Sequence, residues 1–172
     1  MKGTGTQCLE LINASALDFI IGSCHIVDNM DPYYTDFWKN RQDRDAFELY
    51  FKTLLEGLLE FSQIDTLGHL DYVVRYSPNK DSNYSPRDYQ DVIDEILKFI
   101  IEKDIKLEIN TSNLSKGFDF FNPHTDIIKR YKELGGKYVT LGSDAHKAKY
   151  IGYGFDKAYE IANSFDLKIF TL

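Results

Sequence analysis

The sequence has few cysteines and no long apolar run. Cys8 and Cys24 are its two cysteines, too few for a disulfide framework in a chain of 172 residues. The longest apolar stretches, such as residues 19–21 and 99–101, are far shorter than the ~20 residues of a membrane-spanning helix. The first residues also lack the apolar segment of a secretory signal. These absences predict a cytoplasmic protein that does not enter a membrane.

Basic residues are also in the minority. The chain has 20 Lys and Arg against 27 Asp and Glu, which gives a formal net charge of −7. An acidic balance argues against an extended nucleic-acid surface and against a polybasic membrane patch, although a small cationic cleft remains compatible with it. The expected partner is therefore a small molecule.

Apolar residues are plentiful, and their spacing alternates between two periods. Hydrophobic residues make up 43% of the chain, enough for one core, so a single domain over residues 1–172 is expected. Strand-like runs lie at 16–23, 65–69, 105–110, 138–142 and 167–172, and helix-like stretches lie at 47–59, 86–101, 123–134 and 156–165. This order predicts parallel strands joined by right-handed crossovers, which is the α/β class.

Turn residues mark the ends of one helix. Asn122 is expected as the cap of the third helical stretch and Pro123 as its first residue, with Gly135 and Gly136 after its end. For His124, at the same helix start, a solvated or capping role is expected.

Side chains that bind metals follow the predicted strands. His25 follows the first strand, His69 ends the second, and Asp144 and His146 follow the fourth. The carboxyl ends of parallel strands meet at one edge of an α/β sheet, where the connecting loops form the functional site. We therefore expect these four side chains to point towards one cleft.

Imidazole and carboxylate groups suit zinc, manganese or iron, so the pattern favours a divalent metal site. Taken singly, His25 and His69 are also compatible with hydrogen-bonded packing residues, and Asp144 with a turn cap. A nucleophilic thiol at Cys24 is disfavoured, because a neighbour in sequence such as His25 need not contact it in space.

Five short segments together resemble the PHP superfamily, and most of all its histidinol-phosphatase branch. The resemblance extends from about Leu17 to the C-terminus. The segments are Gly22-Ser23-Cys24-His25-Ile26-Val27-Asp28, Asp31-Pro32-Tyr33-Tyr34, Gly68-His69-Leu70-Asp71-Tyr72, Leu107-Glu108-Ile109-Asn110-Thr111-Ser112 and Gly142-Ser143-Asp144-Ala145-His146.

The resemblance implies a distorted (βα)7 TIM-like barrel with up to three divalent metals. It also implies hydrolysis of L-histidinol phosphate in histidine biosynthesis. In that arrangement His25 and His69 would bind one metal, Asp144 a second and His146 a third.

The resemblance and the charge of nearby side chains extend the candidate site. Arg75 and Lys116 are candidate phosphate contacts, with solvated surface cations as the alternative. Glu108 and Asn110 are expected to support the metal ligands, or to pack and cap the strand end, rather than to bind metal. No single residue is assigned as catalytic.

The sequence departs from the family pattern in its first part. The His-x-His motif, the next histidine and the glutamate that bridges two metals cannot be placed: residues 1–24 contain no histidine, and Glu10 lies in a helix-like stretch. We therefore expect a partial barrel without its N-terminal strands. Its open edges, near Leu17 and Leu167, would pair with a second copy or with a missing N-terminal fragment.

Two other functions stay open at this point. One is another PHP phosphoesterase; a polymerase-associated nuclease is disfavoured by the acidic charge and by the segment 31–34. The other is a non-catalytic remnant that only assembles with partners, which the incomplete metal motif favours. For the chain alone we expect weak phosphatase activity or none.

Overall fold

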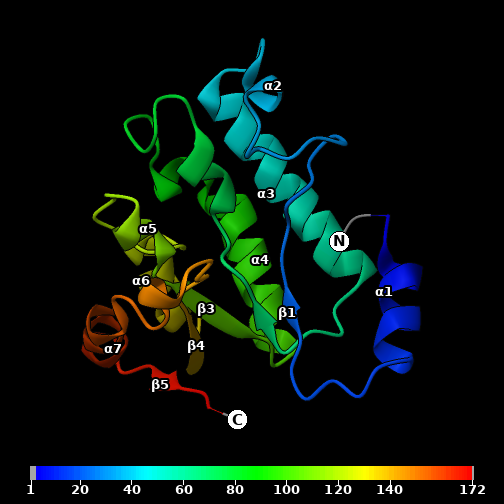
Figure 1. Ribbon diagram of the computed structural model, residues 1–172, viewed down its shortest axis with the longest axis vertical. Helices are drawn as coiled ribbons and strands as arrows, with labels where there is room; N and C mark the ends of the chain where they lie inside the picture. Colours follow the sequence, from blue (N-terminus) through cyan, green and yellow to red (C-terminus); the bar gives the residue numbers. More distant parts are fainter. Residues whose placement is uncertain (1–2, 172) are drawn as a thin grey trace.

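The computed structural model describes residues 3–171, whose strands form one parallel sheet (Figure 1). The strands follow one another in the sheet in chain order. They are β1 (Ile21–Gly22), β2 (Thr66–Leu67), β3 (Lys106–Asn110), β4 (Tyr138–Gly142) and β5 (Lys168–Ile169). The predicted order of five parallel strands with helices between them is confirmed.

The helices alternate with these strands. They are α1 (Gly5–Asn13), α2 (Thr35–Trp38), α3 (Asp43–Glu60), α4 (Gln90–Glu102), α5 (Ser112–Ser115), α6 (Thr125–Glu133) and α7 (Phe155–Ser164), with 3-10 turns η1 (Tyr72–Tyr76), η2 (Pro86–Tyr89) and η3 (Ala148–Tyr150). Right-handed crossovers between strands in sequential order place every crossing helix on the same face of the sheet. The other face is left free to curve inward, as the inside of a barrel does.

Two threonines show how strongly the sheet curves. Thr66 on β2 and Thr140 on β4 approach to 2.8 Å between their hydroxyl oxygens, although β3 lies between them. In a flat sheet, two strands that are not neighbours lie about 9–10 Å apart. The face that carries these hydroxyls is therefore concave.

The core lies between the sheet and its helices. Leu67, Leu107 and Val139 occupy paired positions on β2, β3 and β4 and have no exposed surface. Aromatic and branched side chains of α3 and α4 pack against each other beneath them, among them Phe47, Phe51, Leu58, Ile96 and Ile100. Burying each such side chain stabilises the fold by about 1.5–3 kcal/mol before entropy is counted.

The structure corrects several predicted boundaries. The first strand is paired over Ile21–Gly22 rather than 16–23, because β2 is its only neighbour in the described sheet and the hydrogen bonds begin at Ile20. The last strand is paired over Lys168–Ile169, and Leu172 lies outside the described residues.

The predicted start of α6 is wrong. The helix begins at Thr125, and the His124 ring accepts a hydrogen bond from the Asp126 amide, so the capping role of His124 is confirmed. Asn122 points into the molecule instead, and its peptide bond to Pro123 is cis. The reason is a buried polar network, described below, that takes up the Asn122 side chain.

The two outer strands of the described sheet are β1 and β5. Leu17 and Ile21, at the β1 edge, are 54% and 57% exposed. Leu167, before β5, is buried. Exposed apolar surface was expected at both edges, and it is found at the β1 edge. Within residues 3–171, no helix combines the length and the apolar character needed to cross a membrane.

Candidate active site

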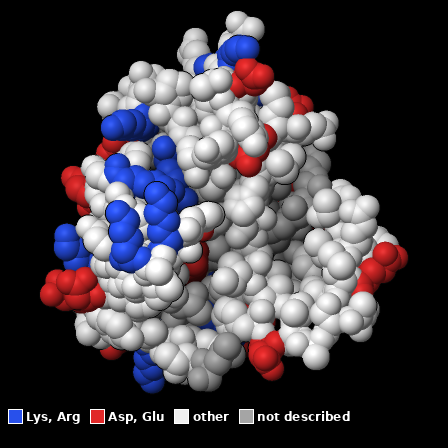
Figure 2. All heavy atoms as spheres, in the orientation of Figure 1, with Lys and Arg blue, Asp and Glu red and all other residues white. Residues whose placement is uncertain are grey.

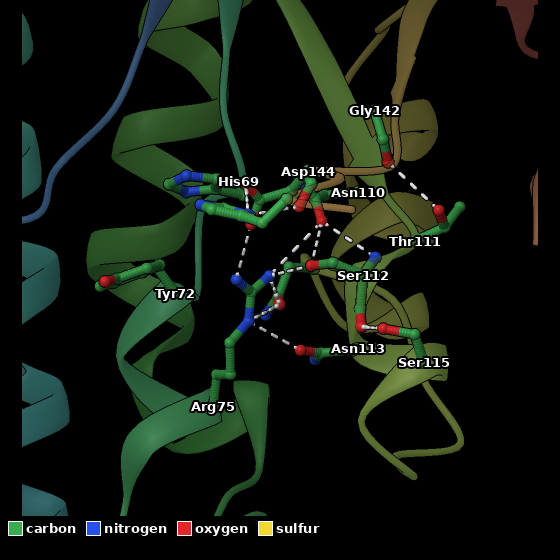
Figure 3. Close-up of polar contacts among 12 residues, drawn as sticks. His69, Tyr72, Arg75, Asn110, Thr111, Ser112, Asn113, Ser115, Gly142 and Asp144 are labelled. Atoms are coloured by element: carbon green, nitrogen blue, oxygen red, sulfur yellow. Dashed lines mark hydrogen bonds and ion pairs between the residues drawn. The ribbon is translucent and has the colours of Figure 1, made fainter. Parts of the chain in front are cut away.

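The loops after the strands bring several candidate residues to one end of the sheet. His69 follows β2, Asn110 ends β3 and Asp144 follows β4 (Figure 3). His69 and Asp144 both have positive φ angles, of 39° and 46°. Residues other than glycine adopt this conformation rarely, and it is common where a functional side chain is held in place.

His25 and His69 lie in direct contact. Their Nε2 atoms are 3.2 Å apart, and both rings pack against Tyr72, with ring centroids 4.8 and 5.1 Å from it. If two nitrogens 3.2 Å apart both bind one zinc ion at about 2.0–2.1 Å, the N–Zn–N angle is about 100°, which is near the tetrahedral angle. The two imidazoles therefore have the spacing of two ligands of a shared metal ion.

The electrostatic surroundings keep both rings neutral at pH 7. Burial and, to a smaller extent, the nearby Arg75 cation lower the pKa of His69 to about 4. Burial also lowers the pKa of His25. Neutral imidazole is the form that binds metals. Among the described residues, the buried Nδ1 of His69 has no hydrogen-bond partner.

The donor set for a metal is short. The part of the chain that the structure describes contains no group of three or more His, Cys, Asp or Glu side chains placed to hold one ion. A catalytic zinc usually has three protein ligands. His25 and His69 thus fit two positions around an ion, and the remaining ligands would have to come from other groups.

The Arg75 guanidinium is buried and hydrogen-bonded, so it is not a solvated surface cation. The Arg75 side chain is 1% exposed and its guanidinium contacts five side-chain oxygens. Nη1 donates to Oδ2 of Asp144 at 3.0 Å, which places the charged group directly beside a predicted metal ligand. The other contacts are with Asn110, Ser112 and Asn113 (Figure 3), and with Asn122.

Asp144 and His146 line one cleft of about 330 Å³ but make different contacts. The Asp144 side chain is 28% exposed and forms an ion pair with Arg75. It therefore does not act only as a solvent-facing turn cap. His146 is 87% exposed at its side chain, and its Nδ1 lies 2.9 Å from the backbone oxygen of Asp144. The structure thus brings Asp144 to Arg75 and leaves His146 at the rim.

Glu108 and Asn110 lie behind the cleft. Both are buried, and Nδ2 of Asn110 donates to Oε2 of Glu108 at 3.2 Å. Burial raises the pKa of Glu108 to about 7; the Asn110 hydrogen bond acts in the opposite direction, and the Asp144 carboxylate adds to the increase. Oε1 of Glu108 contacts the space where Gly142 would carry a Cβ atom, so glycine lets β4 approach this carboxyl group.

Lys116 extends over the same cleft from the end of α5. Its Nζ lies 5.8 Å from the centroid of the Tyr76 ring, and the cleft is also lined by Tyr33, Lys147 and Tyr150. Burial lowers the pKa of Lys116 to about 8, and the Arg75 cation contributes to this. Figure 2 shows Lys and Arg side chains gathered over the region of α5, although the whole chain is acidic.

Sequence reasoning missed the buried partners of Arg75 and the residue behind them. Asn113 and Asn122 accept hydrogen bonds from the guanidinium, and Asp71 binds Asn122. A signal for Asp71 exists in its place two residues after His69, inside a segment already singled out. Nothing in the local sequence indicates that Asn122 points inward.

Comparison with known proteins identifies relatives of this chain. Residues 4–112 match the PHP domain family. A probable histidinol-phosphatase of Clostridium acetobutylicum is 40% identical over 151 residues, which are 88% of this chain and 59% of that protein. The histidinol-phosphatase of Lactococcus lactis subsp. lactis is 33% identical over 143 residues, which are 81% of this chain and 52% of that protein.

A crystal structure gives the same result at the level of the fold. The histidinol phosphate phosphatase of Lactococcus lactis, complexed with zinc, L-histidinol and phosphate, superposes with a TM-score of 0.82 at 26% identity, over 96% of this chain and 63% of that one. The chain thus spans between about half and two thirds of the length of these relatives. The predicted partial TIM-like architecture and the resemblance to the histidinol-phosphatase branch are confirmed. The matched family model covers more than half of the sequence, and the chain belongs to the PHP domain family.

Proposed function

We propose that this chain carries metal- and phosphate-binding residues of a histidinol-phosphatase-like phosphoric monoester hydrolase. The reaction would be hydrolysis of L-histidinol phosphate to L-histidinol and phosphate. The observation that carries the proposal is the His25–His69 pair, with 3.2 Å between Nε2 atoms, at the same end of the sheet as the Arg75–Asp144 ion pair. The relatives named histidinol-phosphatase, and the zinc, L-histidinol and phosphate in the Lactococcus lactis structure, support it.

The assigned roles follow from the positions of the side chains. His25 and His69 would hold one divalent cation (zinc, manganese or iron), and Asp144 and His146 would contact neighbouring ions at the cleft. When bound, such cations activate a water molecule and neutralise charge on the phosphate oxygens.

Cations of this chain would hold the phosphate. Arg75 Nη1 donates to Asp144, which lines the cleft, and Lys116, mostly protonated at pH 7 with a pKa of about 8, lines the same cleft. Glu108 and Asn110 would fix the geometry from behind without touching substrate. The tyrosines of the cleft would enclose the organic part of the substrate.

A purified chain tests the proposal by release of phosphate from L-histidinol phosphate with zinc or manganese. We expect metal-dependent release at least ~100-fold slower than that of the Lactococcus lactis enzyme, because two donors to one ion are fewer than a catalytic site uses and even the loss of groups behind the ligands costs 10–100-fold. His69→Ala should abolish the activity, whereas His124→Ala, which changes a helix cap, should keep it. Release unaffected by His69→Ala would overturn the proposal, and no release with either metal would favour the non-catalytic alternative.

The alternative with support in the structure is a non-catalytic assembly module. The observation that favours it is the short donor set around His25 and His69 within residues 3–171. The third possibility is a PHP phosphoesterase with a different substrate. A panel of other phosphate monoesters in the same assay distinguishes it from a histidinol-phosphatase. We further propose a cytoplasmic location, with the free Cys8 and Cys24 consistent with it, and no nucleic-acid partner.

A further inference from the structure

A buried carboxylate lies behind the candidate site and takes no part in it directly. Asp71, which follows β2, has no exposed surface. Its Oδ1 accepts a hydrogen bond of 2.6 Å from Nδ2 of Asn122, and its Oδ2 accepts from the His124 backbone amide at 2.7 Å and from the Tyr84 hydroxyl at 3.3 Å. All three partners donate, so Asp71 acts as a pure acceptor.

These contacts determine which way the Asn122 amide faces. A carboxamide presents a donor on one side and an acceptor on the other, and its orientation is set by its partners. Because Asp71 takes the NH2 group, Oδ1 of Asn122 faces Arg75 and accepts from Nη2 at 2.7 Å and from Nε at 3.2 Å. The Asn122 backbone is held by two hydrogen bonds with Asn110, of 2.8 and 3.0 Å.

The same chain of contacts reaches the cleft. The guanidinium of Arg75 is planar and rigid, so fixing Nε and Nη2 also fixes the direction of Nη1. Nη1 donates a hydrogen bond to the carboxylate of Asp144, and Asp144 lines the cleft. Asp71 is therefore linked to Asp144 through Asn122 and Arg75 (Figure 3 shows the Arg75 end).

We propose that Asp71 is a positioning residue: it orients the Asn122 amide so that its oxygen, rather than its NH2 group, meets Arg75, and thereby aims Nη1 at Asp144 and the phosphate position. The effect on phosphate rests on the proposed function. The effect on Arg75 does not.

Exchange of the two side chains gives a direct test. In Asp71→Asn the His124 backbone amide can only donate, so it retains the amide oxygen and the new NH2 group faces the Asn122 NH2 group. Either two donors then meet there or Asn122 turns its NH2 group towards Arg75. Asn122→Asp places two carboxylates side by side. The double exchange, Asp71→Asn with Asn122→Asp, restores one donor facing one acceptor and again offers an oxygen to Arg75. Tyr84→Phe is the matched control, since it removes a hydrogen bond from the other oxygen of Asp71.

Two readouts are measured on the whole chain: calorimetric affinity for inorganic phosphate in the presence of zinc, and the ¹⁵N–¹H signal of Arg75 Nε. We expect each single exchange to weaken phosphate binding about tenfold, the equivalent of one hydrogen bond to a charged group, and to move the Arg75 signal. The double exchange should recover both, with affinity within about threefold of the original chain. Tyr84→Phe should leave both unchanged.

Three results decide the matter. If Asp71→Asn behaves as Tyr84→Phe does, or if the double exchange is no better than the single ones, the positioning role is overturned. If Asp71→Asn does not fold, a folded double exchange with a normal Arg75 signal supports the role, and an unfolded one overturns it. If the original chain binds no phosphate, the proposed function fails, while the Arg75 signal still decides the role of Asp71.

Discussion

Glu108 offers a quantitative test of the electrostatics behind the cleft. Burial raises its pKa in the folded protein to about 7 from an ordinary value of 4.5. The folded chain therefore holds this proton more tightly than the unfolded chain does. Its contribution to stability is fully present below about pH 4.5 and is lost as the pH rises through 7.

The size of the effect follows from the two pKa values. Each tenfold difference in proton affinity is worth about 1.4 kcal/mol, so the difference between 4.5 and about 7 amounts to about 3 kcal/mol. Glu108→Gln keeps the shape of the side chain and removes the charge. We expect the free energy of unfolding of this variant to exceed that of the original chain by up to about 3 kcal/mol at pH 8, and to equal it near pH 4.5.

Urea unfolding followed by the fluorescence of buried Trp38 measures both proteins between pH 4.5 and 8. Glu102→Gln is the control, because the Glu102 side chain is 76% exposed and its removal should change stability by no more than about 0.5 kcal/mol at any pH. Parallel curves for the original chain and Glu108→Gln would refute the reasoning.

Three further predictions concern packing and assembly. Gly142→Ala should destabilise the chain by about 1–3 kcal/mol in urea unfolding, since its Cβ would overlap with Oε1 of Glu108; an unchanged midpoint would show that the carboxyl group moves freely. Phe47→Ala should cost about 3–5 kcal/mol, whereas Leu59→Ala, at a 65% exposed position, should cost little; equal losses would contradict the described core. The chain should self-associate through the exposed β1 edge, and Ile21→Lys should reduce this in light scattering; a stable monomer at micromolar concentration would contradict the edge-pairing prediction.

The alternation of strands and helices could be predicted from the sequence because the apolar periodicity of each element depends on neighbouring residues only. The alternation over 105–110 corresponds to β3 within one residue, and the stripe that begins at Phe47 lies within α3, which begins four residues earlier, at Asp43. The first and last strands were predicted too long, because a paired strand also needs a neighbour, and a propensity pattern does not show where that neighbour ends. The short α2, which lies outside every helix-like stretch identified in the sequence, has too few residues for a periodic signal.

The candidate site was predictable only in part. Histidines and carboxylates after strands could be placed at one edge, and His25 and His69 do meet there. Arg75 was expected as a phosphate contact or a surface cation, yet its guanidinium is buried among oxygens that come from three distant segments. Such a network depends on tertiary contacts, so neither its existence nor the inward turn of Asn122 follows from neighbouring residues.

The central claim, that His25 and His69 are two ligands of one divalent cation, is tested most directly by zinc bound to the purified chain and to His25→Ala and His69→Ala. Competition with a chromogenic chelator gives the affinity, and X-ray absorption gives the ligands. The account predicts a zinc ion with two imidazole nitrogens at about 2.0–2.1 Å, and an affinity that falls at least tenfold when either histidine is removed. Zinc binding of equal strength in all three proteins, or zinc without imidazole ligands, would contradict it.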